Sequence, residues 1–125
     1  MKTMEYEEIM GLHTALKKGL DPEDQVQKEY RAKYNGKDGF LVVSNRKLFF
    51  TEKRGFLRTS YNLILELPYE EISDITVEAA SKLALTDTEG KKHDFESHEN
   101  AASVIERNLN DLIRTALPKI KAQLR

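Results

Sequence analysis

Short apolar runs separated by polar turns dominate the middle of the chain. The clearest pair lies within residues 39–50, where two apolar runs flank a tight polar turn at residues 44–47. Runs this short, rich in aromatic and β-branched residues, are typical of paired strands rather than of a helix. Both parities of the first run are apolar, so we expect that strand to be covered on both faces. The pattern predicts that this hairpin forms the centre of the core.

Alternation of apolar and polar positions predicts five more strands. Residues 26–34 alternate and lead into an Asn-Gly pair and Gly39, where we expect a turn that needs positive φ. Residues 61–67 alternate up to Pro68, which cannot donate to a strand ladder and therefore ends the strand before a bend or short helical turn. The remaining strands are expected around residues 75–79, 83–85 and 93–95. The chain thus contains seven short predicted strands.

Helical periodicity appears at both ends of the chain. A first helix is predicted over residues 3–18, with a narrow apolar stripe formed by Ile9, Leu12, His13 and Leu16. A second is predicted after Ser97, its expected cap, with a longer stripe formed by Ala101, Ile105, Leu109, Leu112, Ala116 and Ile120. Pro118 removes one backbone hydrogen bond, so this helix should stop near residue 117 or kink there and continue as a short tail.

These elements have few packing solutions. Seven strongly bent antiparallel strands must close on themselves, and the amphipathic helix must cover the end that stays open. The predicted fold is therefore mainly β with helices, a small barrel capped by the C-terminal helix, plus an N-terminal helix. We expect an accessory helix and hinge over residues 1–24 and the barrel domain over 25–125, with strands at about 26–96, the capping helix at about 98–117 and a tail to 125.

Composition narrows the possible environments and ligands. Cysteine is absent, which excludes disulfides and thiolate metal sites. The first eight residues lack the apolar stretch of a signal peptide, and no apolar run approaches the length of a membrane span, so we expect a cytoplasmic protein. The net charge of -1 argues against general nucleic-acid binding.

The charge is nevertheless uneven along the chain. Residues 26–60 hold nine basic and three acidic groups, whereas residues 1–25 hold three and six, and residues 61–125 hold eight and twelve. A basic middle between acidic ends suggests one basic face. The alternative is that these lysines and arginines only solvate the outward positions of strands.

Several of these segments resemble one family. The run over residues 39–50, the Leu-Pro-Tyr-Glu-Glu-Ile segment over residues 67–72, the Leu-x-Leu pair at 83–85, Gly90 and Phe95 are similar to the prokaryotic pleckstrin-homology-like and GRAM-like domains. The resemblance covers about residues 26–117. It implies a capped antiparallel barrel that serves as a binding module. The basic pattern of phosphoinositide-binding members is approached by Lys28, Arg31 and Lys33 but is not met.

Known reaction chemistries find little support in the sequence. The glycines form no phosphate loop or dinucleotide fingerprint, and neither a nucleophile elbow nor an H-E-x-x-H motif is present. The best metal candidate joins His93 and His98 with Glu99, but alternation sends His93 inward and His98 outward. We therefore expect no catalytic residue, no metal site, no cofactor and no small-molecule substrate; an enzyme with an unrecognised site is the least favoured alternative.

Two binding hypotheses remain. The favoured one is a protein-interaction or scaffold domain, with a protein partner or self-association through a sheet edge or the leading helix. The alternative is peripheral binding to an anionic membrane surface through the loops after the first, third and sixth strands, which the fold would gather at the end opposite the helix. The candidate ligand-binding residues in those loops are Lys33, Lys37, Lys53, Arg54, Phe56, Arg58, Lys91 and Lys92.

Overall fold

One bent antiparallel sheet and one helix make up the part of the chain that can be described. The computed structural model describes residues 24–55 and 60–123, with side chains as far as residue 117. The predicted first helix and the loop residues Phe56 and Arg58 lie outside these ranges. The elements are β1 (Val26–Tyr34), β2 (Lys37–Ser44), β3 (Lys47–Arg54), β4 (Ser60–Pro68), the 3₁₀ turn η1 (Tyr69–Glu71), β5 (Ile72–Ala79), β6 (Lys82–Asp87), β7 (Lys92–Ser97) and α2 (Ala102–Gln123).

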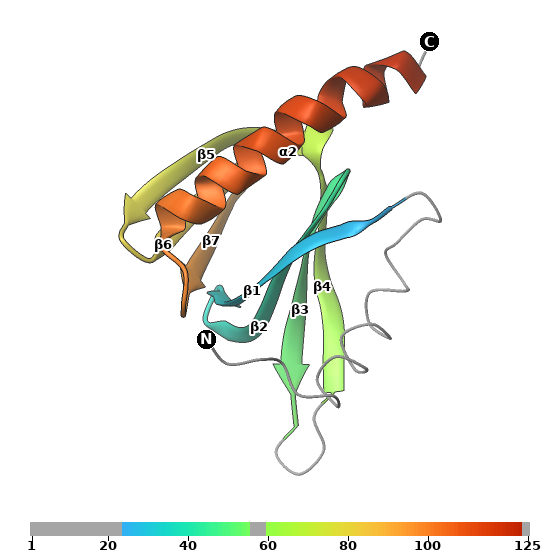
Figure 1. The fold of residues 1–125 in the computed structure, drawn as a ribbon. Coiled ribbons are helices and arrows are strands. Elements are labelled where there is room, and N and C mark those ends of the chain that lie inside the picture. Colours follow the sequence, from blue (N-terminus) through green and yellow to red (C-terminus); the bar gives the residue numbers. More distant parts are fainter. Residues whose placement is uncertain (1–23, 56–59, 124–125) are drawn as a thin grey trace.

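The sheet bends at β1. Its strand order is β4-β3-β2-β1-β7-β6-β5, so β1 joins two halves that are distant in sequence. β1 pairs with β2 along nearly its whole length but with β7 only through residues 32–34. Figure 1 shows the β2–β4 half turning away from the β5–β7 half, with α2 lying across the open side. The capped, strongly bent architecture predicted from the sequence is thus confirmed.

The main core lies between the two halves of the sheet and α2. It contains Tyr30, Leu41, Val43, Leu48, Phe50, Leu83, Leu85, Phe95, Ile105 and Leu109, all buried. A second buried cluster occupies the opposite face of β2–β4 and consists of Phe40, Val42, Phe49 and Tyr61, with Val26 and Leu63 packed against it. Residues 40–43 are all buried, which confirms that this strand is covered on both faces.

The tight turns use the expected chemistry. Asn35 and Gly36 both adopt positive φ (50° and 81°), as the two-residue β1–β2 turn requires. At the β2–β3 turn, the Ser44 hydroxyl oxygen accepts the backbone N–H groups of Arg46 and Lys47. Tyr69 of η1 donates its hydroxyl to the Ser44 carbonyl, so η1 is anchored to the same turn.

Two boundaries differ from those predicted. Gly39 lies within β2 rather than in the turn, and it is needed there because an added Cβ would approach the Thr51 carbonyl oxygen to 1.8 Å. α2 begins at Ala102, later than the expected start at about residue 98. Ser97 belongs to β7, where its hydroxyl accepts the Asn100 N–H. The first N–H of the helix, that of Ala102, donates to the Ala80 carbonyl, and the Ala101 carbonyl accepts the N–H groups of Val104 and Ile105. The helix continues through Pro118 to Gln123.

Candidate functional site: a mixed-charge groove beside the β1–β2 turn

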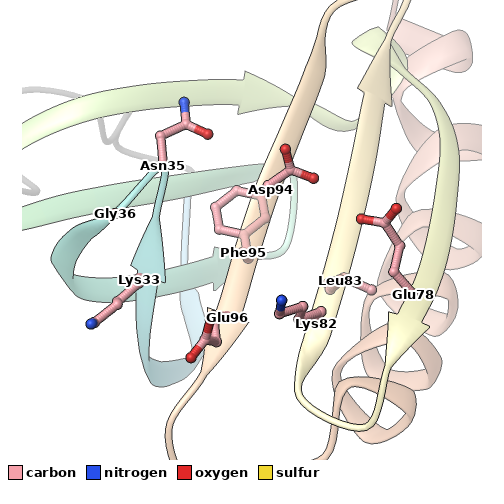
Figure 2. Close-up of a pocket in the computed structure, with 9 residues that line it drawn as sticks. All are labelled: Lys33, Asn35, Gly36, Glu78, Lys82, Leu83, Asp94, Phe95 and Glu96. Carbon is pink, nitrogen blue, oxygen red and sulfur yellow. The ribbon is translucent and has the colours of Figure 1, made fainter.

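A groove of about 270 Å³ opens beside the β1–β2 turn. Figure 2 shows that its side chains come from four neighbouring strands, β1, β7, β6 and β5. Its residues are Lys33, Asn35, Gly36, Glu78, Lys82, Leu83, Asp94, Phe95 and Glu96. Because outward positions alternate along each strand, the charged members share the outer face of this half of the sheet.

Strand register places opposite charges side by side in this groove. Glu96 of β7 lies directly opposite Lys33 of β1 on one side and opposite Lys82 of β6 on the other. Opposite charges at directly facing positions on antiparallel strands stabilise the pairing modestly and lower the local potential. The outer face therefore carries a row of alternating sign, Lys33–Glu96–Lys82.

A second set of ion pairs continues the alternation. Lys92 Nζ lies 3.0 Å from Glu78 Oε2 and 3.5 Å from Asp94 Oδ1. The hydrogen bond to Glu78, together with the charge of Asp94, raises the pKa of Lys92. Lys92 is therefore paired with two carboxylates. Together with the row, this face combines three lysines with three carboxylates, namely Lys33, Lys82, Lys92, Glu78, Asp94 and Glu96.

A buried chain of polar side chains holds the strands around the groove. The Tyr34 hydroxyl lies 2.8 Å from His93 Nδ1, and His93 Nε2 lies 3.0 Å from Asp87 Oδ2. Since an ionised carboxylate only accepts hydrogen bonds, His93 donates its Nε2–H to Asp87, and its Nδ1 faces the Tyr34 hydroxyl. The hydrogen bonds to Asp87 from His93 and from the backbone N–H groups of Lys91 and Glu89 lower the pKa of that carboxyl.

The Asp–His–Tyr order resembles a catalytic relay, but its surroundings are those of a core. His93 is only 3% exposed, and the Tyr34 ring stacks on Phe95 with centroids 5.0 Å apart. Burial raises the pKa of Tyr34. Neither Tyr34, His93 nor Asp87 lines either of the hollows described here. The chain instead ties β1 to β7 and to the β6–β7 turn, and so fixes the groove.

Another hollow, of about 370 Å³, lies at the other side of the β1–β2 hairpin. It is lined by Arg31, Asp38, Gly39, Phe40, Lys53, Gly55 and His98. The Arg31 guanidinium lies over the Phe40 ring, 5.3 Å from its centroid. His98 Nε2 lies 3.2 Å from Asp38 Oδ1, so this hollow also contains an acid beside its basic groups.

The predicted loop residues are divided between these places. Lys33 lines the mixed-charge groove, and Lys53 lines the second hollow, which shares no lining residue with the groove. Arg54 donates its Nε–H to Glu52 Oε1 at 2.6 Å, and Lys92 pairs as described above. Lys37 and Lys91 are exposed. The structure therefore does not unite the described candidates into one patch of a single sign.

Four charged residues of the groove lie outside the set of candidates that the sequence predicts. These are Glu78, Lys82, Asp94 and Glu96. Their outward direction was visible from alternation, but their position beside Lys33 depends on the β1–β7 pairing, which joins segments about sixty residues apart. Predicting these residues requires the register of the β1–β7 pairing, which no local sequence pattern specifies.

The described residues offer neither a metal cluster nor a membrane-spanning helix. No group of three or more potential ligand side chains comes together among them. His93 points inward and His98 outward, as the alternation predicts. In the same part of the chain, no helix is both long and apolar enough to cross a membrane.

Comparisons with known proteins agree with the fold. The family described as "Bacterial PH domain" matches residues 20–120. The chain belongs to this family. Domains of this family are generally non-catalytic and usually serve as binding or scaffold modules. No curated protein matches the chain significantly.

Two solved structures show the same PH fold. A pleckstrin homology domain from Shewanella amazonensis SB2B shares 21% identity over 94% of each chain, with a TM-score of 0.53. The C-terminal domain of an unknown protein from Leishmania infantum shares 13% identity, with a TM-score of 0.61, over 84% of this chain and 98% of that one. At these identities the likeness concerns the fold only.

Proposed function

We propose that this PH domain is a non-catalytic protein-interaction module that binds its partner at the mixed-charge groove. The observation that carries the proposal is the row Lys33–Glu96–Lys82, in which the central carboxylate faces a lysine on each side. A surface of alternating sign has little net potential for anions, yet it discriminates strongly between partners through the placement of their charges. A partner segment that carries both signs fits this surface better than an anionic membrane does.

Site-specific photo-cross-linking in cells tests this proposal. A benzophenone amino acid at Asp94 lies in the groove but leaves the row Lys33–Glu96–Lys82 intact, and the same residue at the exposed Arg107 of α2 serves as the matched control. We expect a defined protein adduct from position 94 that is absent from position 107. The adduct should disappear when Glu96→Lys reverses the central charge. Equal adducts from both positions, or none from position 94, would count against the groove as the interface.

A second candidate function is peripheral binding to anionic lipid. The observation that favours it is the second hollow, where Arg31, Lys53 and His98 gather. Co-sedimentation with phosphatidylserine-containing vesicles across a salt series tests this function, because charge-driven binding weakens as salt screens it. Binding that falls with salt and is lost in Lys53→Glu would support the lipid function over the groove. Absence of co-sedimentation at low salt would rule out the lipid-binding function.

A further inference from the structure

The second buried cluster has no cover among the described elements. Val42 and Phe49 are 0% exposed, although they point away from the main core, on the outer face of β2–β4. α2 packs on β5, β6 and η1, and its buried side chains up to residue 117 belong to the main core. A side chain on the open face of a single sheet stays exposed unless another segment lies over it. None of the described elements therefore accounts for the burial of this cluster.

The length of each segment outside the described ranges limits whether it could cover Val42 and Phe49. Residues 56–59 must leave β3 and return to β4, so they reach roughly 7 Å from the end of β3. Phe49 lies five positions before Arg54, about 17 Å along the strand. The four-residue loop is therefore too short to cover Val42 and Phe49, whereas the 23 residues that precede Asp24 are long enough.

The described chain also begins at this face. Asp24 Oδ2 lies 3.7 Å from Lys47 Nζ, and the Asp24 side chain is 0% exposed. The backbone of Gln25 exchanges two hydrogen bonds with Asn45, one with its side-chain oxygen and one with its backbone N–H. Val26 then packs on the outer cluster. These contacts place the first described residues at the outer face of β2–β4.

The apolar pattern, the length and the charge of residues 1–23 are compatible with the outer face of β2–β4. The stripe Ile9, Leu12, His13 and Leu16 is apolar on one side, and Leu20 continues it one turn later. A helix over residues 3–18 would be about 24 Å long and 10 Å wide, which matches eight residues of β3, about 27 Å, and the width of three strands. Residues 1–25 carry more acidic than basic side chains, whereas β1 and β3 carry the basic residues Arg31, Lys47 and Lys53. The segment and the strands are therefore complementary in charge.

We propose that residues 1–23 dock as an amphipathic helix on the outer face of β2–β4, over Val42, Phe49 and Leu63. The outer face is then an intramolecular interface filled by the chain's own N-terminal segment. This inference does not depend on the proposed function of the groove. It makes the apolar stripe of the segment part of the folded domain.

Paramagnetic relaxation in the full chain tests the docking. The chain contains no cysteine, so Thr14→Cys, off the stripe, provides a single site for a nitroxide label. We expect strong broadening of the methyl signals of Val42 and Leu63 and sharp signals for Leu85 and Leu109, which belong to the core beside α2. Mixing isotope-labelled chains with separate nitroxide-labelled chains should remove the broadening, because the contact is within one molecule.

A stripe variant and a matched control complete the experiment. Leu12→Glu in the nitroxide-labelled chain should abolish the broadening of Val42, whereas Met4→Glu, which adds the same charge off the stripe, should preserve it. Equally sharp Val42 and Leu109 signals in the unmodified labelled chain would overturn the proposal. Broadening that survives in the mixed sample would overturn it as well, because a second copy of the chain would then be the occupant.

Discussion

At the residue scale, Gly39 shows how the two central strands depend on one missing side chain. Its Cβ would lie 1.8 Å from the Thr51 carbonyl oxygen, and backbone cannot rotate away as a side chain can. We expect Gly39→Ala to separate β2 from β3 locally and to lower the free energy of unfolding by about 3 kcal/mol, the upper end of ordinary overpacking. Chemical denaturation measures this loss.

Gly90 provides the control for this substitution. It has φ 84° and open space around the position of a Cβ, so Gly90→Asn should change the free energy of unfolding by less than about 1 kcal/mol. A Gly39→Ala protein as stable as Gly90→Asn would show that the strands approach each other less closely than described.

Asp87 gives a residue-scale prediction that depends on pH. Its pKa is lowered by the hydrogen bond from His93 and by those from Lys91 and Glu89, so its contribution to stability is full above its ordinary pKa, near 4, and is lost as pH falls through the lowered value. Asp87→Asn should therefore have a lower Tm than the wild type at pH 7, and the difference should shrink below about pH 4. A difference in Tm that stays constant down to pH 2 would contradict this role.

At the element scale, α2 stabilises the domain through one face. Leu109 is 1% exposed in the main core, whereas Val104 of the same helix is 40% exposed. We expect Leu109→Ala to cost about 2–5 kcal/mol and Val104→Ala to be nearly neutral, because Ala favours helices and no packing is lost. Equal losses of unfolding free energy in the two variants would mean that the helix does not cap the sheet through this face.

Elements whose pattern is local were the ones the sequence could predict. The apolar run at residues 40–43 predicts a strand buried on both faces, and the Asn35–Gly36 pair predicts the turn before it. Both predictions succeed because the sequence patterns that determine these elements span only a few neighbouring residues. The start of α2 was placed too early because Ser97 satisfies a cap pattern while belonging to β7. The charge row of the groove was missed because Lys33 and Glu96 meet only through strand pairing across the sheet.

At the scale of the whole molecule, we expect the distribution of charge to matter more than its total. The chain has a net charge of -1, and the groove balances its lysines with carboxylates. Glu96→Lys would place three lysines side by side across β1, β7 and β6 and remove the carboxylate between them. If the groove avoids anionic membranes through this balance, the variant should acquire affinity for them that the wild type lacks.

Vesicle co-sedimentation measures that gain. Each basic side chain near an anionic surface contributes about 1 kcal/mol, so the reversal should strengthen binding by about 1–2 kcal/mol, or roughly five- to thirty-fold, at low salt. The gain should vanish at high salt as screening sets in. Glu70→Lys changes the net charge equally but lies on η1, away from the groove, and should not bind. Equal sedimentation of both variants would mean that total charge governs membrane affinity, and strong binding by the wild type would favour the lipid function over the protein-binding groove.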